Sequence, residues 1–177
     1  LPLLSASEES GLTGSWKLDI AGSSSISPWD QQLLEITITA GIVQFDREMQ
    51  WSRHRSVSDV TRVEPDGVTV TTNLVTHWLD TWYNNVYIGT DHQKQVRGEW
   101  LDGGQGLKLV TNLNLEAQQG DVPVQIDETY LLSADGNTLT LTQVRSTRDQ
   151  PLNYVFTRVL KFTEPEGTIT TASGLKI

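Results

Sequence analysis

The sequence consists largely of short runs in which apolar and polar residues alternate. A period of two is typical of β-strands that bury one face. The runs are 14–20, 33–39, 42–52, 57–64, 67–77, 86–90, 94–101, 106–115, 123–132, 137–145 and 153–162. Turn-forming residues separate them, for example "PDG" at 65–67 and "ADGN" at 134–137, in which Asp135-Gly136 is a strong hairpin signal. The pattern predicts an all-β fold of about ten strands joined by short turns.

Consecutive hairpins form an antiparallel meander, and a long meander buries one face most easily by closing on itself. We therefore predict an antiparallel up-and-down β-barrel of about 8–10 strands, with a two-sheet sandwich as the alternative. A short helix at 27–34 or 78–85 stays open. The expected organisation is a flexible N-terminal tail at 1–12, a single barrel domain at 13–163 and a C-terminal tail at 164–177.

The charge balance and the missing cysteines narrow the classes of partner and chemistry. Lys and Arg total 13 against 22 Asp and Glu, and the resulting net charge of −9 repels phosphate, so neither nucleic acid nor anionic lipid is expected as a partner. The absence of cysteine excludes disulfides and thiolate chemistry. No apolar run reaches the ~18 residues of a membrane-spanning helix. The chain starts at Leu1 rather than Met, which leaves the localisation unknown and favours a secreted or periplasmic one after loss of a signal peptide.

Alternation divides each run into an inward and an outward face. The expected inward residues are Trp16, Leu18, Ile20, Leu34, Ile36, Ile38, Val43, Phe45, Met49, Trp51, Val68, Val70, Leu74, Trp78, Leu107, Leu109, Leu113, Leu115, Val124, Ile126, Tyr130, Leu132, Leu139, Leu141, Tyr154, Phe156, Leu160 and Phe162. Three charged residues fall on these faces: Arg47, Glu128 and Arg158. Each needs a partner or a ligand, because an isolated inward charge costs several kcal/mol.

The two ends of the barrel region carry a recognisable pair of motifs. Gly14-Ser15-Trp16 lies on the first run and Arg158 lies in "YVFTRV" on the last, while "LSADGNTLTLTQV" precedes it. Together they resemble lipocalin-like (calycin-type) domains of bacteria, and Thr90-Asp91-His92 is similar to a loop motif of that family. The resemblance implies that Trp16 packs across the closed end of the barrel with Arg158 over its indole, so that Gly14, Trp16 and Arg158 close the barrel.

Two functions follow from such a barrel, and a third reading is a filled structural domain. In the first, the barrel binds a small, mostly apolar molecule in a cavity lined by Phe45, Trp51, His77, Trp78, Trp82, Leu109 and Ile126. The alternative, which the resemblance implies, is a cyclase, isomerase or lyase. Glu128 would then be the acid or base, Arg47 would hold a substrate oxygen, and Tyr130 would donate a hydrogen bond to that oxygen.

The charged pair Arg47 and Glu128 also fits a purely internal salt bridge. The histidines His54, His77 and His92 are scattered, so no metal and no cofactor are expected. A small apolar ligand or substrate is the expected partner, and a homodimer stays open.

Overall fold

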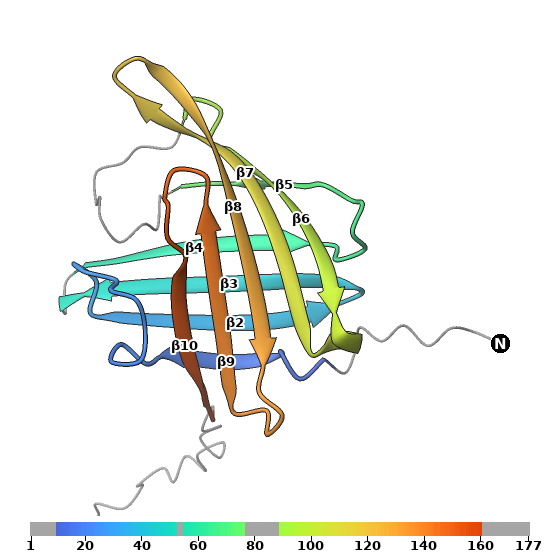
Figure 1. The fold of residues 1–177 in the computed structure, drawn as a ribbon. Helices are drawn as coiled ribbons and strands as arrows, with labels where there is room; N and C mark the ends of the chain where they lie inside the picture. Colours follow the sequence, from blue (N-terminus) through green and yellow to red (C-terminus); the bar gives the residue numbers. More distant parts are fainter. Residues whose placement is uncertain (1–9, 53–54, 77–88, 161–177) are drawn as a thin grey trace, which may run out of the picture.

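The computed structural model describes residues 10–52, 55–76 and 89–160 of the chain. Within them ten strands form one antiparallel sheet that curves into a nearly closed barrel (Figure 1). The strands are β1 (Gly14–Leu18), β2 (Gln31–Thr39), β3 (Ile42–Trp51), β4 (Arg55–Val63), β5 (Thr71–Leu74), β6 (Gln93–Leu101), β7 (Gly106–Ala117), β8 (Gly120–Leu132), β9 (Thr138–Arg145) and β10 (Leu152–Val159). A short 3₁₀ turn, η2 (Asp102–Gly104), joins β6 to β7. The predicted all-β up-and-down barrel is confirmed.

The strand order shows how the meander closes. The order is β4-β3-β2-β1-β10-β9-β8-β7-β6-β5, so every neighbour in the sheet is a neighbour in the chain except β1 and β10. The first and last strands pair antiparallel, with Trp16 directly opposite Arg158. The sheet edges are β4 and β5, which are connected in sequence and face each other across a seam without a strand ladder.

Turn chemistry fixes the register of the hairpins. Thr39 pairs with Ile42, which leaves a two-residue turn between β2 and β3. Both of its residues have positive φ, 51° at Ala40 and 82° at Gly41. Turns of this kind match the twist of the strands that they join, and glycine supplies the left-handed conformation at low cost.

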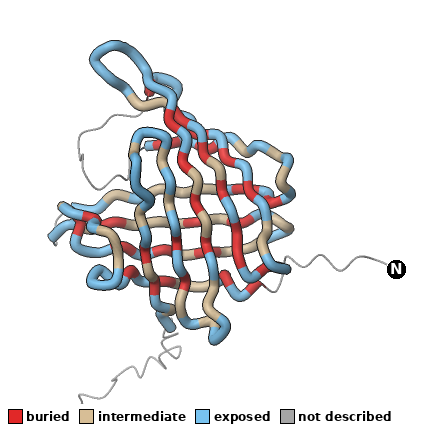
Figure 2. Tube along the Cα trace, viewed as in Figure 1, coloured by how far each residue is buried: buried red, intermediate tan, exposed pale blue. Residues whose placement is uncertain are grey.

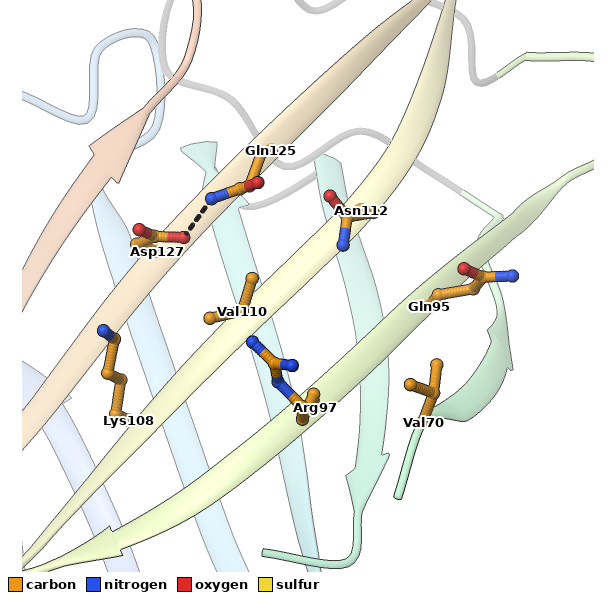
Figure 3. A pocket seen from close by; sticks show the side chains of 8 residues that line it. All are labelled: Val70, Gln95, Arg97, Lys108, Val110, Asn112, Gln125 and Asp127. Carbon is orange, nitrogen blue, oxygen red and sulfur yellow. Dashed lines mark hydrogen bonds between the residues drawn. The ribbon is translucent and has the colours of Figure 1, made fainter. Parts of the chain in front are cut away.

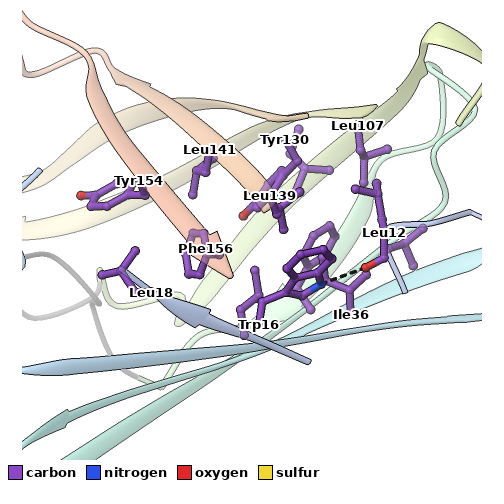
Figure 4. Close-up of a cluster of buried hydrophobic side chains, with 14 of the residues drawn as sticks. Leu12, Trp16, Leu18, Ile36, Leu107, Tyr130, Leu139, Leu141, Tyr154 and Phe156 are labelled. Carbon is purple, nitrogen blue, oxygen red and sulfur yellow. Dashed lines mark hydrogen bonds between the residues drawn. The ribbon is translucent and has the colours of Figure 1, made fainter. Parts of the chain in front are cut away.

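The main hydrophobic cluster fills one end of the barrel, which we call the Trp16 end. Side chains of at least six strands meet there (Figure 4), and many of these residues are completely buried. Figure 2 marks the buried positions along the strands. The largest are Trp16, Tyr130, Phe156, Leu12, Leu34 and Ile36. Burial of one such side chain contributes about 1.5–3 kcal/mol, so this end is a solid core.

The inward face differs from the prediction at both ends of several runs. Ile20, Trp51 and Leu160 continue the alternation but lie exposed at or beyond strand ends, where no opposite wall covers them. Trp78 and Phe162 lie outside the described residues.

The predicted strand at 67–77 is wrong in phase. The chain turns at 66–69, where the Asp66 carboxylate accepts hydrogen bonds from the backbone of Val68 and Thr69, and β5 begins only at Thr71. Val68, Val70 and Leu74 are therefore exposed, whereas Asn73 and Val75 are buried.

The barrel core includes residues that lie before the predicted domain boundary. Ser10 and Leu12 belong to the predicted tail at 1–12, yet both are buried, and the Ser10 hydroxyl donates a hydrogen bond to the Gly104 carbonyl. The short helix that the sequence left open at 27–34 is absent, because β2 begins at Gln31. The other one, at 78–85, the strand at 86–90 and the tail at 164–177 lie wholly or mostly outside the described residues.

Candidate functional site

Three predicted site residues meet in the barrel interior. Arg47 Nη2 donates hydrogen bonds to Tyr130 Oη at 2.8 Å and to Glu128 Oε1 at 3.3 Å. Arg47 lies on β3, and Glu128 and Tyr130 lie on β8, with β2, β1, β10 and β9 between them in the sheet. The contact therefore crosses the interior of the barrel, as the alternation of the two strands predicts.

Neighbours on other strands complete the surroundings of Glu128 and Tyr130. Gln143, which is paired with Glu128 across the β8–β9 ladder, donates from Nε2 to Glu128 Oε1 at 3.1 Å. Phe45 packs against Tyr130 with ring centroids 5.1 Å apart. Tyr130 is completely buried. Its hydroxyl therefore accepts the hydrogen bond from Arg47 but is not accessible to a ligand in this structure.

A second ion pair, which the sequence analysis did not identify, lies beside the first. Lys94 Nζ on β6 donates to Asp59 Oδ2 and, at 2.7 Å, to Thr61 Oγ1, both on β4. Asp59 is the cross-strand partner of Arg47, so the two ion pairs form one polar band around the inner wall. The sequence signal that could have revealed Lys94 is its spacing of two residues from Val96, because alternation places both side chains on the same face of β6.

Burial and neighbouring charges act in opposite directions on the cations of this band. Burial alone would lower the pKa of Arg47, but Tyr130, Glu128 and Asp59 together raise it above its usual value. For Lys94, burial outweighs Asp59 and lowers the pKa. Burial, reinforced by Glu128, raises the pKa of Tyr130, which keeps the phenol neutral.

Accessibility changes along the inner wall at the level of this band. On β7 the exposed fraction is 0% at Leu107 and 1% at Leu109, but 7% at Thr111 and at Leu113. On β8 it is 0% at Tyr130, 7% at Glu128 and 8% at Ile126. The interior is therefore packed solid at the Trp16 end, and residual accessible surface begins at Glu128. We call the part beyond this level the far half.

The far half has an apolar side as well as a polar one. Val75, Leu113, Val124 and Ile126 form a second hydrophobic cluster, against which Leu115 packs. Thr111, which lies between Leu109 and Leu113 on the inward face of β7, is also buried. The arrangement differs from the mostly apolar lining that the sequence predicts, because charged and amide side chains occupy the middle of the barrel.

The remaining predicted lining residues are divided. Phe45 and Leu109 are buried in the main core, and Ile126 lies in the far half. Trp51 does not line the interior: it is 41% exposed at the end of β3, where the Arg55 guanidinium lies 5.7 Å from its ring. His77, Trp78 and Trp82 lie outside the described residues.

The closure motif has the geometry that the resemblance implies. The Arg158 guanidinium carbon lies 4.2 Å from the Trp16 ring centroid, and Trp16 Nε1 donates to the Leu12 carbonyl at 3.0 Å. Gly14 has a φ of +143°, and a Cβ there would lie 2.5 Å from Arg158 Nη1. Glycine at this position therefore lets the arginine pass close to β1.

The outer wall carries grooves as well. One of about 360 Å³ lies over β6, β7 and β8 and is lined by Val70, Gln95, Arg97, Lys108, Val110, Asn112, Gln125 and Asp127 (Figure 3). Gln125 and Asp127 bond to each other at 2.9 Å within it. These side chains alternate with the inward residues of the same strands, so the groove is separate from the interior.

The described residues show no group of three or more His, Asp or Glu side chains that could hold a metal ion. Among the same residues no helix has the length and hydropathy needed to span a membrane.

No protein-family model matches the chain, and no curated protein matches it. Among solved structures, the secretory abundant heat soluble protein 4 from Ramazzottius varieornatus is similar to this chain at 11% sequence identity and a TM-score of 0.44. The alignment covers 86% of this chain and 97% of that one.

Proposed function

We propose that the protein binds a small molecule in the far half of the barrel, with its apolar part against Val124 and Ile126 and its polar end at Arg47 and Glu128. The observation that carries the proposal is the step in accessibility along β7 and β8. Leu107, Leu109 and Tyr130 are at most 1% exposed toward the Trp16 end, whereas the next inward residues along the same strands, Thr111, Glu128 and Ile126, are 7–8% exposed.

The chemistry of the wall supports the same conclusion. Ligand sites in proteins combine an apolar enclosure with a few polar groups that fix orientation. The far half has both, because the cluster around Val124 lies next to the ion pair of Arg47 and Glu128. The lipocalin-like resemblance is part of this proposal, and the stacking of Arg158 on Trp16 supports it.

Binding of a neutral fluorescent probe, N-phenyl-1-naphthylamine, tests the proposal. The wild-type protein should enhance the emission of the probe when the probe is present at micromolar concentration. Ile126→Trp should fill the far half and weaken probe binding at least about tenfold, which corresponds to about 1.4 kcal/mol. The matched control is Val144→Trp on the outer wall, where Val144 is 48% exposed. Equal binding by both variants, or no binding by the wild type, would refute the proposal.

An enzymatic role is the second candidate, and the convergence of Arg47, Glu128 and Tyr130 favours it. In that role Glu128 transfers the proton, Arg47 holds the substrate, and the buried Tyr130 positions Arg47. Liquid chromatography coupled to mass spectrometry of a small-metabolite extract incubated with the protein tests it, because chromatography also separates isomers of equal mass. The wild type should convert one component of the extract into a product of different retention time, and Glu128→Gln should leave that component unchanged. Conversion of no component by the wild type, or equal conversion by Glu128→Gln, would refute this role of Glu128.

A further inference from the structure

We propose that the polar end of the ligand is a hydrogen-bond donor, a hydroxyl or an amine, and not a carboxylate. This inference rests on the proposed binding function and names the class of ligand. It follows from the hydrogen bonds within the two interior ion pairs and from the accessible surface that their carboxylate side chains keep.

Both carboxylates keep accessible surface inside the barrel. Glu128 Oε1 accepts hydrogen bonds from Arg47 and Gln143, and 10% of the Glu128 side chain remains accessible. Asp59 Oδ2 accepts from Lys94 and Thr61, and 12% of the Asp59 side chain remains accessible. Two anionic acceptors are therefore available to a ligand.

The cations are largely engaged. Arg47 uses Nη2 for both Glu128 and Tyr130, and its Nε is buried without an acceptor. Arginine grips a carboxylate through two parallel N–H groups of its planar fork. Here Nη2 belongs to both possible forks, so a ligand carboxylate would have to displace Glu128 or Tyr130. Lys94 Nζ is likewise held by Asp59 and Thr61.

The charge balance points in the same direction. Arg47 and Lys94 offset Glu128 and Asp59, so the described band is neutral before a ligand enters. A carboxylate would add an unpaired negative charge beside these two carboxylates, within a protein of net charge −9. A hydroxyl or an amine instead donates a hydrogen bond to them.

Competition with three ligands of equal chain length tests the inference. Octanol, octylamine and octanoate are each titrated below their aggregation limit against bound N-phenyl-1-naphthylamine at pH 7. Octanol and octylamine should displace the probe at concentrations at least about tenfold lower than octanoate, because placing like charges together costs more than the ~1.4 kcal/mol of a factor of ten. Octanoate binding as tightly as octanol would overturn the inference while leaving the proposed function intact. A probe that never binds would instead refute the proposed function.

Two isosteric variants test whether the preference for octanol over octanoate arises inside the barrel. Glu128→Gln removes the negative charge of the carboxylate and should reduce the preference for octanol over octanoate about tenfold, through tighter octanoate binding. The matched control Asp127→Asn removes the same charge from the next residue, which lies on the outer wall, and should leave the preference unchanged. Far-ultraviolet circular dichroism checks that both variants fold. Equal preferences in folded Glu128→Gln and the wild type would also overturn the inference.

Discussion

Arg47 illustrates how a charge is kept inside an apolar barrel. Its guanidinium lies on an inward face, and 18% of its side chain remains accessible. Burial alone would lower its pKa, but Tyr130, Glu128 and Asp59 raise it, so Arg47 stays a cation at every pH at which the protein folds. The stability of the pair comes mainly from avoiding an unpaired charge, because a buried ion pair by itself contributes little.

Arg47→Met should therefore destabilise the protein by about 3–5 kcal/mol near pH 8, since it leaves Glu128 without its cation. The double variant Arg47→Met/Glu128→Gln should recover much of this loss. Urea unfolding of both variants and the wild type at pH 8 measures these costs.

The matched control for this change is Arg97→Met, which removes an arginine from the outer wall. It should change stability by no more than about 0.5 kcal/mol. A cost below about 1 kcal/mol for Arg47→Met at pH 8 would contradict the interpretation of the pair.

Sequence alone identified Arg47 and Glu128 because each interrupts a clearly apolar face. Asp59 and Lys94 escaped the same reasoning, because the apolar faces that they share with Val57 and Val96 are short and are interrupted by small or polar residues. Trp51 shows the converse error. Its alternation is correct, but alternation does not reveal where the opposite wall of the barrel ends.

At the level of elements, the seam between β4 and β5 is where the sequence prediction fails and the structure compensates. The inward and outward faces of β5 are the reverse of those predicted, so the Asn73 side-chain amide points inward and contacts β4. Asn73 Oδ1 accepts from the Arg62 amide nitrogen at 2.8 Å, and its Nδ2 donates to the Arg62 carbonyl at 3.0 Å. One side chain thus supplies the two hydrogen bonds that a paired residue would make. No periodicity argument predicts this, because Asn73 reads as a polar, outward residue.

Asn73→Ala should leave both Arg62 groups without their partner and destabilise the protein by about 1–3 kcal/mol. Hydrogen exchange at the Arg62 amide should accelerate, which heteronuclear magnetic resonance detects residue by residue. Asn112→Ala, on the exposed outer wall, serves as the control and should leave both quantities near the wild-type values. Unchanged protection of the Arg62 amide in Asn73→Ala would show that the seam does not depend on this side chain.

The turn before β5 adds a pH-dependent contribution. Hydrogen bonds from Thr69 and Val68 lower the pKa of Asp66 to about 2, from an ordinary value of 3.8. A lowered folded-state pKa stabilises the fold above the unfolded pKa, and this contribution disappears as the pH falls through the folded one. The stability difference between the wild type and Asp66→Asn should therefore be constant from pH 5 to 7 and shrink between about pH 4 and pH 2. Thermal unfolding across this range measures it, and a difference that grows toward low pH would contradict the assignment.

For the whole molecule, the up-and-down topology was predictable because it depends on the order of strands and turns, which periodicity reveals. The closure of β1 on β10 was predictable only from the pair of Trp16 and Arg158. The burial of Ser10 and Leu12 was not, since they are covered by the β6–β7 turn and the Trp16 end, which are distant in sequence. Such contacts depend on the assembled barrel and leave no local pattern.

Closure should also depend on the planar fork of Arg158. Its Nε donates to the Gly136 carbonyl at 2.7 Å, Nη1 to Thr13 at 2.9 Å and Nη2 to Gly11 at 2.6 Å, while the ring of Trp16 lies beneath. One side chain therefore joins the N-terminal segment to the β8–β9 turn.

Arg158→Met should cost about 2–5 kcal/mol, because three carbonyls lose a charged donor and the cation–π contact disappears. Arg158→Lys should recover only a minor part of this loss, since an ammonium keeps the charge but cannot reach three diverging acceptors. Urea unfolding followed by both tryptophan fluorescence and circular dichroism measures the cost and tests whether the two signals still coincide. A lysine variant as stable as the wild type would show that charge alone closes the barrel and that the fork geometry is irrelevant.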